Sequence, residues 1–186
     1  SLRMRGADKL MQPVGDVTAL HRIARIASRL CPTVVVTLPD GGPHAAPRKA
    51  EVVGTGARPL PIPDAHEGMA ASLRAGVRSA GNAEGLMILL PDMPALTEDD
   101  LSAVIAAWRA DPNRTVRGTA YDGTPGHPVI LPRRLFGEVL VLTGDEGARR
   151  VLAGEAVTKV RLPGRHATMD LDTPEDWDDW RAGLIS

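Results

Sequence analysis

The sequence contains few aromatic residues, one cysteine and no long apolar stretch. Phe, Trp and Tyr together make up 3% of the 186 residues, too few for the ring surfaces on which single-stranded nucleic acid stacks. One cysteine excludes an internal disulfide framework and a zinc site built only from cysteines. No apolar run reaches the length of a membrane span, and no signal peptide opens the chain. We therefore expect a cytoplasmic protein that does not interact with membranes.

The charges of the chain are nearly balanced, with 22 Lys and Arg against 23 Asp and Glu. A protein that binds nucleic acid through its backbone needs a wide basic surface, which this composition does not provide. The length fits one domain with a sizeable core. We expect a single domain over residues 1–186 and no nucleic-acid partner.

Segments with a helical period alternate with short β-branched or apolar segments. This alternation predicts an α/β protein with helices layered on a sheet. Strands are predicted at 33–38, near 51–53, and at 86–90, 115–121, 128–131, 157–162 and 167–171. Helices are predicted at 17–30, 69–79, 132–142 and 146–152, and after the N-caps Thr97 and Thr173; Trp177, Trp180 and Leu184 are expected on the buried side of the last one.

Asp92 follows the most apolar predicted strand, Leu-Met-Ile-Leu-Leu, between two prolines. Ligands of α/β sheets lie beyond the carboxyl ends of the strands, and the next helix has Thr97 as its own cap. A carboxylate at this point is suited to hold Mg²⁺, which takes one or two carboxylates together with phosphate oxygens. The alternative is an ordinary turn aspartate.

A second pair of acids, Asp170 and Asp172, lies before the helix start Thr173-Pro174. Asp170 would close a strand and is the preferred second metal ligand, provided that the two strand ends are neighbours. Asp172 remains the other candidate, or else shapes the helix start alone.

Three further segments carry polar groups without a specific signal of their own. The basic N-terminal stretch holds Arg3 and Lys9, which could neutralise a polyphosphate or simply be solvated. The turn at Gly68 leads into a helix whose first amides, and Ser72, could meet a polar ligand. His127, between Gly and Pro, is expected to be exposed and could contact an acceptor substrate, or be structural.

Taken together, the motifs of the chain resemble the MobA-like nucleotidyltransferases, and within them the molybdenum cofactor cytidylyltransferase branch. The matching segments occur in family order at residues 1–4, 8–10, 68–76, 90–94, 126–129, 143–149 and 170–176. Each match is modest, and their combination is specific.

The resemblance implies a Rossmann-like three-layer domain with a mostly parallel central sheet. It implies transfer of CMP from CTP, with Mg²⁺, to a phosphorylated acceptor such as molybdopterin, and possible handover of the product to a molybdoenzyme or its chaperone. Under this resemblance Arg3, Lys9 and Asp92 are catalytic, and Asp92 and Asp170 bind the metal. His127 would face the acceptor. The residues that would contact the nucleotide are Ser1, Arg3, Lys9, Gly68, Met69 and Ser72.

The family signature begins with Leu-Ala-Ala-Gly, which does not occur before Arg3-Met4 in this sequence, and Arg5 replaces the usual glycine. We therefore expect a first strand and part of the phosphate loop to be missing before residue 1. Three alternatives stay open: a related guanylyl- or methylerythritol phosphate cytidylyltransferase, a glycosyltransferase that uses Asp170-Leu171-Asp172 as its metal motif, and a non-catalytic nucleotide-binding domain.

Overall fold

A computed structural model of the protein describes residues 4 and 7–185. The strands are β1 (Pro13–Val14), β2 (Val17–Thr18), β3 (Val35–Pro39), β4 (Arg58–Ile62), β5 (Gly85–Ile88), β6 (Thr115–Thr119), β7 (Pro125–Pro132) and β8 (Val157–Arg161). The α-helices are α1 (Ala19–Leu30), α2 (Ala45–Val52), α3 (Met69–Ser79), α4 (Glu98–Ala110), α5 (Phe136–Leu140), α6 (Ala148–Val151) and α7 (Pro174–Arg181). Short 3₁₀ turns are η1 (Lys9–Met11), η2 (Ala65–Glu67) and η3 (Arg133–Leu135). In this part of the chain no helix is both long and apolar enough to cross a membrane.

The largest sheet has the strand order β5-β7-β6-β8. β7 runs antiparallel to both β5 and β6, while β8 is parallel to β6. β5, β6 and β8 therefore point in one direction and only β7 opposes them. The parallel pair β3-β4 and the short antiparallel pair β1-β2 complete the strands of the described residues. The predicted α/β fold with a mostly parallel central sheet is confirmed.

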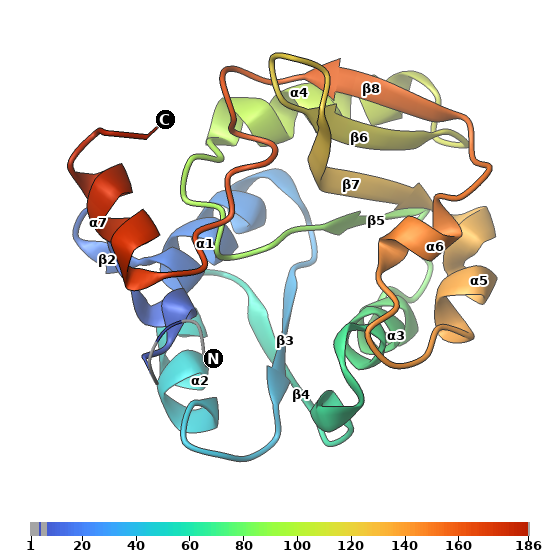
Figure 1. Ribbon diagram of the computed structural model, residues 1–186. Coiled ribbons are helices and arrows are strands. Elements are labelled where there is room, and N and C mark those ends of the chain that lie inside the picture. The colour runs from blue at the N-terminus through green and yellow to red at the C-terminus, as the bar shows by residue number, and fades with distance from the viewer. Residues whose placement is uncertain (1–3, 5–6, 186) are drawn as a thin grey trace.

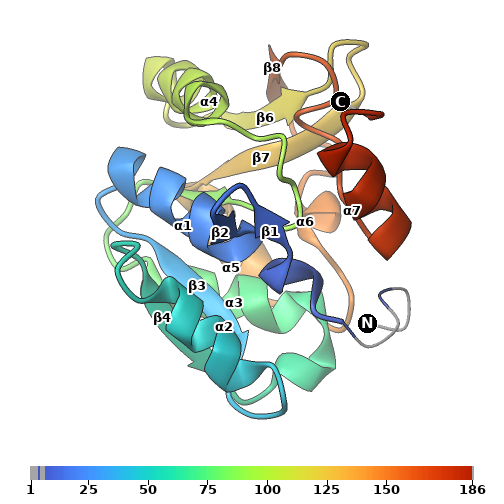
Figure 2. The same ribbon diagram turned by 90° about the vertical axis from the view of Figure 1, so that its left-hand side faces the viewer.

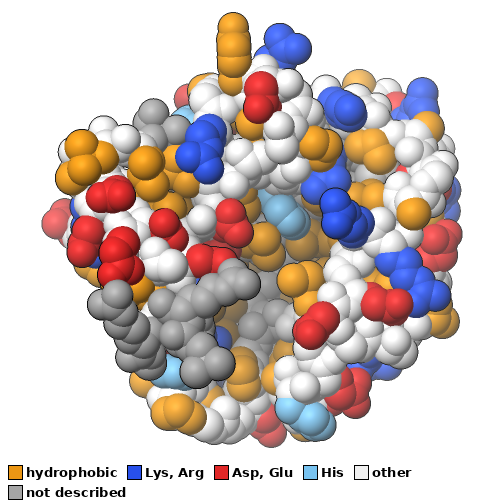
Figure 3. Space-filling view, in the orientation of Figure 1, with side chains coloured by type: hydrophobic (Ala, Val, Ile, Leu, Met, Phe, Trp, Pro, Cys, Tyr) orange, Lys and Arg blue, Asp and Glu red, His pale blue; other side chains and the backbone are white. Residues whose placement is uncertain are grey.

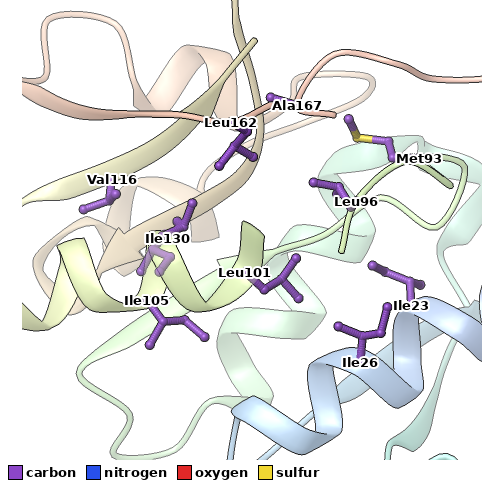
Figure 4. Close-up of a cluster of buried hydrophobic side chains, with 11 residues drawn as sticks. Ile23, Ile26, Met93, Leu96, Leu101, Ile105, Val116, Ile130, Leu162 and Ala167 are labelled. Carbon is purple, nitrogen blue, oxygen red and sulfur yellow. The ribbon is translucent and has the colours of Figure 1, made fainter. Parts of the chain in front are cut away.

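Helices cover both faces of the large sheet (Figures 1 and 2). One face packs against α1 and α4, where Ile23, Leu101, Val116 and Ile130 belong to one buried cluster (Figure 4). The opposite face packs against α3, α5 and α6 through a second cluster that includes Val129. α7 joins a third cluster beside β1. The resulting layers are helix, sheet and helix, as in other α/β domains.

The helix starts follow the predicted caps. Thr97 and Asp100 form a reciprocal capping box at α4, and Thr173 and Asp176 form another at α7. In each case the threonine hydroxyl accepts from the amide three residues on, and the aspartate accepts from the threonine amide. Both predicted caps are confirmed. They could be predicted because a capping box depends on residues only three positions apart.

Three predictions about elements are wrong. Residues 51 and 52 end α2 and Val53 is its C-cap, since Arg48, Lys49 and Ala50 are good helix formers and Val52 is buried by packing and not by strand pairing. Residues 167–171 alternate between buried and less buried positions, yet form the end of a turn and an irregular segment, because Thr168 and Met169 bond back to Arg165. Leu184 lies beyond α7 and is 73% exposed.

An apolar groove of about 640 Å³ lies between β3 and β5. In the described residues β3 pairs only with β4, and β5 only with β7, so each strand has one edge without a strand partner. The lining includes Leu20, Val36 and Leu86, from a helix and both strands. The groove thus separates the β3-β4 pair from the large sheet.

Candidate active site

Asp92 lies in the turn after β5 and is 8% exposed. Its Oδ2 lies 2.5 Å from the ammonium nitrogen of Lys9. Its Oδ1 is buried and has no hydrogen-bond partner among the described residues. A buried carboxylate oxygen without a donor is costly, so this oxygen is suited to receive a cation or another ligand.

Lys9 is held in place by the residue before it. The Asp8 carboxylate accepts from the amide of Leu10 at 3.1 Å and from two guanidinium nitrogens of Arg48 at 2.7 and 2.8 Å. Burial alone would raise the pKa of Asp8, but the bonds from Arg48 and Leu10 outweigh it and hold this pKa below its usual value. The charged pair therefore anchors the turn from which Lys9 extends.

The Lys9 ammonium bridges two carboxylates that are far apart in the sequence. It lies 2.8 Å from Oδ1 of Asp172 as well as beside Asp92. Burial alone would lower the pKa of Lys9, but the hydrogen bonds and charges of Asp172 and Asp92 raise it above its usual value. Lys9 is thus positively charged throughout the neutral pH range.

The segment 170–172 lies next to Asp92 because the amide of Leu171 donates to the Asp92 carbonyl at 3.1 Å. Leu171 is buried, whereas Asp170 on one side of it is exposed and Asp172 on the other side is half-buried. The structure therefore brings the two predicted acidic segments together, and Asp172 is the residue that contacts Lys9. Asp172 was only the second choice from the sequence, because its hydrogen bond from Lys9 joins residues 163 positions apart and cannot be seen in a local pattern.

His127 is half-buried, and its Nδ1 is buried without a partner among the described residues. The expectation that His127 is exposed is wrong, because Gly126 packs against the backbone of Ala167 and the His127 amide donates to the Ala167 carbonyl at 2.7 Å. Burial lowers its pKa most, and the charge of Arg117 lowers it further; together they outweigh the hydrogen bond to the Ile88 backbone and the charges of Asp92 and Asp170. Because the pKa lies below its ordinary value of 6.5, the imidazole is mostly neutral at pH 7.

The predicted nucleotide-binding turn has a conformation that requires glycine. Gly68 has φ +99° and ψ −163° and precedes α3. A Cβ on Gly68 would lie 2.4 Å from an Asp145 carboxylate oxygen and 2.7 Å from the Gly144 carbonyl. The start of α3 therefore packs closely on the turn at 144–147, leaving Met69 49% exposed and Ser72 half-buried. The other predicted residues of this group, Ser1 and Arg3, lie outside the described residues.

The face of the molecule seen in Figure 1 is hollowed at its centre (Figure 3). A histidine side chain lies in the hollow, with acidic side chains gathered on one side and basic side chains on the opposite side. Within residues 4 and 7–185 no group of three His, Cys, Asp or Glu is placed to hold a metal ion. A cation would therefore need substrate or water oxygens besides the carboxylates, which is how Mg²⁺ is often bound.

Arg117 is a charged residue near this site that the sequence analysis did not select. It lies in the middle of β6 and is only half-exposed, and its Nε donates to the Gly126 carbonyl at 2.8 Å. An arginine in the middle of the short strand Thr-Val-Arg-Gly-Thr could have marked Arg117 as a candidate site residue, because arginine is seldom buried without a partner.

Comparison with known proteins identifies the family. A sequence model of the MobA-like NTP transferase domain matches residues 1–161. The chain belongs to this family, as its motifs predicted.

Two curated relatives are similar over much of the chain. The purine catabolism protein PucB of Bacillus subtilis (strain 168) is 37% identical over 62% of this chain, and the match covers 57% of the relative. The phosphoenolpyruvate guanylyltransferase of Nocardia farcinica (strain IFM 10152) is 32% identical over 77% of this chain and 61% of the relative. The matched regions thus span less than two thirds of each relative's own length.

A solved structure with a bound metal has the same fold. The Rv0371c protein of Mycobacterium tuberculosis H37Rv in complex with manganese is 25% identical, with a TM-score of 0.74 over 91% of this chain and 89% of that one. This similarity, together with the family match, fits a nucleotidyltransferase that depends on a divalent metal.

Proposed function

We propose that this protein transfers a nucleoside monophosphate, CMP from CTP in the first instance, to a phosphate on an acceptor such as molybdopterin, and releases pyrophosphate. The observation that carries the proposal is the meeting of Lys9, Asp92 and the 170–172 segment beyond the end of β5. In a chain of the NTP transferase family, a lysine beside paired acids suits a triphosphate and its metal.

In the proposed reaction an oxygen of the acceptor phosphate attacks the α-phosphorus of the nucleotide. The bond from that phosphorus to the oxygen that bridges to the β-phosphate breaks in line, and pyrophosphate leaves with the electron pair. Lys9, and Arg3 with it, would neutralise charge on the leaving group. No covalent enzyme intermediate is required, so the protein acts by positioning and by electrostatic stabilisation.

Asp92 and Asp170 would hold the divalent ion, with Mg²⁺ as the proposed metal. The buried Oδ1 of Asp92 has no donor among the described residues, and Asp170 is exposed beside it, so the donor set fits a hard cation. Such an ion supplies Lewis-acid stabilisation of phosphate oxygens when it is bound. Asp170, which is exposed, stays the preferred second ligand, and Asp172, which accepts from Lys9, is the other candidate.

The remaining residues are assigned by their place in the family motifs. Gly68, Met69 and Ser72, together with Ser1, would contact the nucleotide at the start of α3. His127 would face the acceptor, because the charges of Arg117, Asp92 and Asp170 all act on its imidazole. A neutral imidazole in that place can donate or accept one hydrogen bond without adding charge.

A pyrophosphate-release screen tests the function. CTP, GTP and ATP are each combined with molybdopterin, methylerythritol phosphate or phosphoenolpyruvate, in Mg²⁺ or Mn²⁺. The proposal expects the fastest release with CTP and molybdopterin. GTP with phosphoenolpyruvate is the second candidate, since one relative is named for that reaction. Nucleotide binding without release for any pair would instead favour a non-catalytic domain.

The variant Asp92→Asn tests the proposed metal ligand. Its activity should fall by about 100-fold or more, the usual loss when one stabilising contact to developing charge is removed. Asp99→Asn removes an equal charge from the exposed first turn of α4 and serves as the matched control. Normal metal-dependent turnover of the Asp92 variant would show that the assignment is wrong.

We further propose that a strand preceding residue 1 occupies the groove between β3 and β5. Both strands offer an edge there, and the lining is apolar on either side. Hydrogen exchange compares this chain with a longer form that carries such a strand. The amides of β3 and β5 should become strongly protected in the longer form, and unchanged protection would refute the placement.

The cytoplasm is the proposed location, and delivery of the product to a molybdoenzyme or its chaperone is the proposed next step. The handover follows only if molybdopterin is the acceptor. A pull-down with product-loaded protein tests the handover, which predicts capture of a molybdoenzyme or its chaperone only when product is bound.

A further inference from the structure

Two basic side chains lie side by side on one face of the large sheet. Arg117 on β6 is paired in register with Lys159 on β8, so the two side chains leave the same face of the sheet. Their neighbours Val116 and Val160 point to the opposite face, where both contact the cluster around α4. Arg117 and Lys159 therefore extend on the side of α6.

Arg149 on α6 adds a third positive charge to this face. Burial lowers the pKa of Arg117, and repulsion from Arg149 lowers it further. In the part of the chain that the structure describes, no carboxylate pairs with Arg117, Lys159 or Arg149. Three neighbouring cations without a counter-ion repel one another, and an anion bound among them would relieve that repulsion.

The basic group lies next to the candidate active site. Arg117 is fixed to the loop of His127 through its bond to the Gly126 carbonyl. His127 experiences the charge of Arg117 as well as those of Asp92 and Asp170. The hollow in Figure 3 has acidic side chains on one side and basic ones opposite.

We propose that Arg117, Arg149 and Lys159 form the subsite that binds the phosphate of the acceptor. This inference rests on the proposed function, which brings two polyanionic substrates into one hollow. Their mutual repulsion has to be offset at two separate places. Lys9 and the metal carboxylates serve the triphosphate on the acidic side, which leaves the basic side for the acceptor. A guanidinium fork and an ammonium group are well suited to phosphate oxygens.

Direct binding of inorganic phosphate tests the subsite without knowledge of the acceptor. Side-chain Nε–H signals of arginine are followed by NMR as phosphate is added to the intact protein. The signals of Arg117 and Arg149 should shift together, and Arg117→Gln should raise the phosphate Kd about tenfold, as expected for loss of one charged hydrogen bond. Arg117→Lys, which keeps the charge but not the fork, should recover part of the affinity.

The matched control is Arg58→Gln, at the exposed start of β4, which removes one positive charge from the other side of the groove. It should leave phosphate binding unchanged. Equal Kd values for the Arg58 and Arg117 variants, or shifts confined to other arginines, would overturn the subsite. Thermal unfolding of each variant checks that the fold is retained.

Steady-state kinetics then separates this inference from the proposed function. With the substrate pair found in the pyrophosphate screen, Arg117→Gln and Lys159→Gln should raise KM for the acceptor about tenfold and leave KM for the nucleotide unchanged. A rise in the nucleotide KM instead would assign the cations to the triphosphate and refute the subsite. If no pair releases pyrophosphate, the proposed function fails, while the phosphate titration still decides whether the anion site exists.

Discussion

Replacement of Gly68 by alanine should be the most damaging single-methyl change at the proposed nucleotide-binding turn. Gly68 has φ +99°, and an alanine there carries backbone strain of about 1–3 kcal/mol. The new Cβ would also lie 2.4 Å from an Asp145 oxygen and 2.7 Å from the Gly144 carbonyl. Because the second neighbour is backbone, relief of the overlap requires movement of the 144–147 turn, which adds about 1–3 kcal/mol.

Gly42→Ala is the control for this prediction, since Gly42 has φ +93° but no atom within 4 Å of the added Cβ. Urea unfolding of both variants measures the difference. Gly68→Ala should lose about 2 kcal/mol more than Gly42→Ala, with the same m-value. It should also raise the nucleotide KM, because the start of α3 is displaced. Equal losses in the two variants would refute the argument from close contact.

Other predictions concern the supports of the site. Thr173→Ala removes the cap of α7 and should cost about 1 kcal/mol, measured by the urea midpoint, whereas no change would mean that the cap is dispensable. Trp177→Ala empties a fully buried position and removes the hydrogen bond from the indole to the Leu171 carbonyl. The free energy of unfolding should therefore fall by about 3–5 kcal/mol, and a fall of less than about 1 kcal/mol would contradict the packing. The lowered pKa of Asp8 predicts stability that is complete above its usual value of 3.8 and declines as the pH falls below it towards the folded pKa. Asp8→Asn should flatten that part of the profile, and an equally steep decline in the variant would refute the link.

Local features of the fold followed closely from the sequence. Helix α3 has the bounds that its apolar period predicts, and both threonine caps are present. β4 was missed because Pro59 and Pro61 interrupt the usual strand pattern, which a strand at the edge of a sheet tolerates. The turn end and irregular segment at 167–171 were missed for the converse reason, since alternating burial arose there without a strand partner.

The sequence by itself determined the family, the α/β alternation with most of its longer helices and strands, and the acidic residues of two segments. These features depend on contacts within about one helical turn or on the alternation along one strand. Only the tertiary structure decided that Lys9 bridges Asp92 and Asp172, that His127 is half-buried and neutral, and that Arg117 faces Lys159. Charge, burial and strand register depend on which distant segments become neighbours, and that is settled only when the whole chain packs.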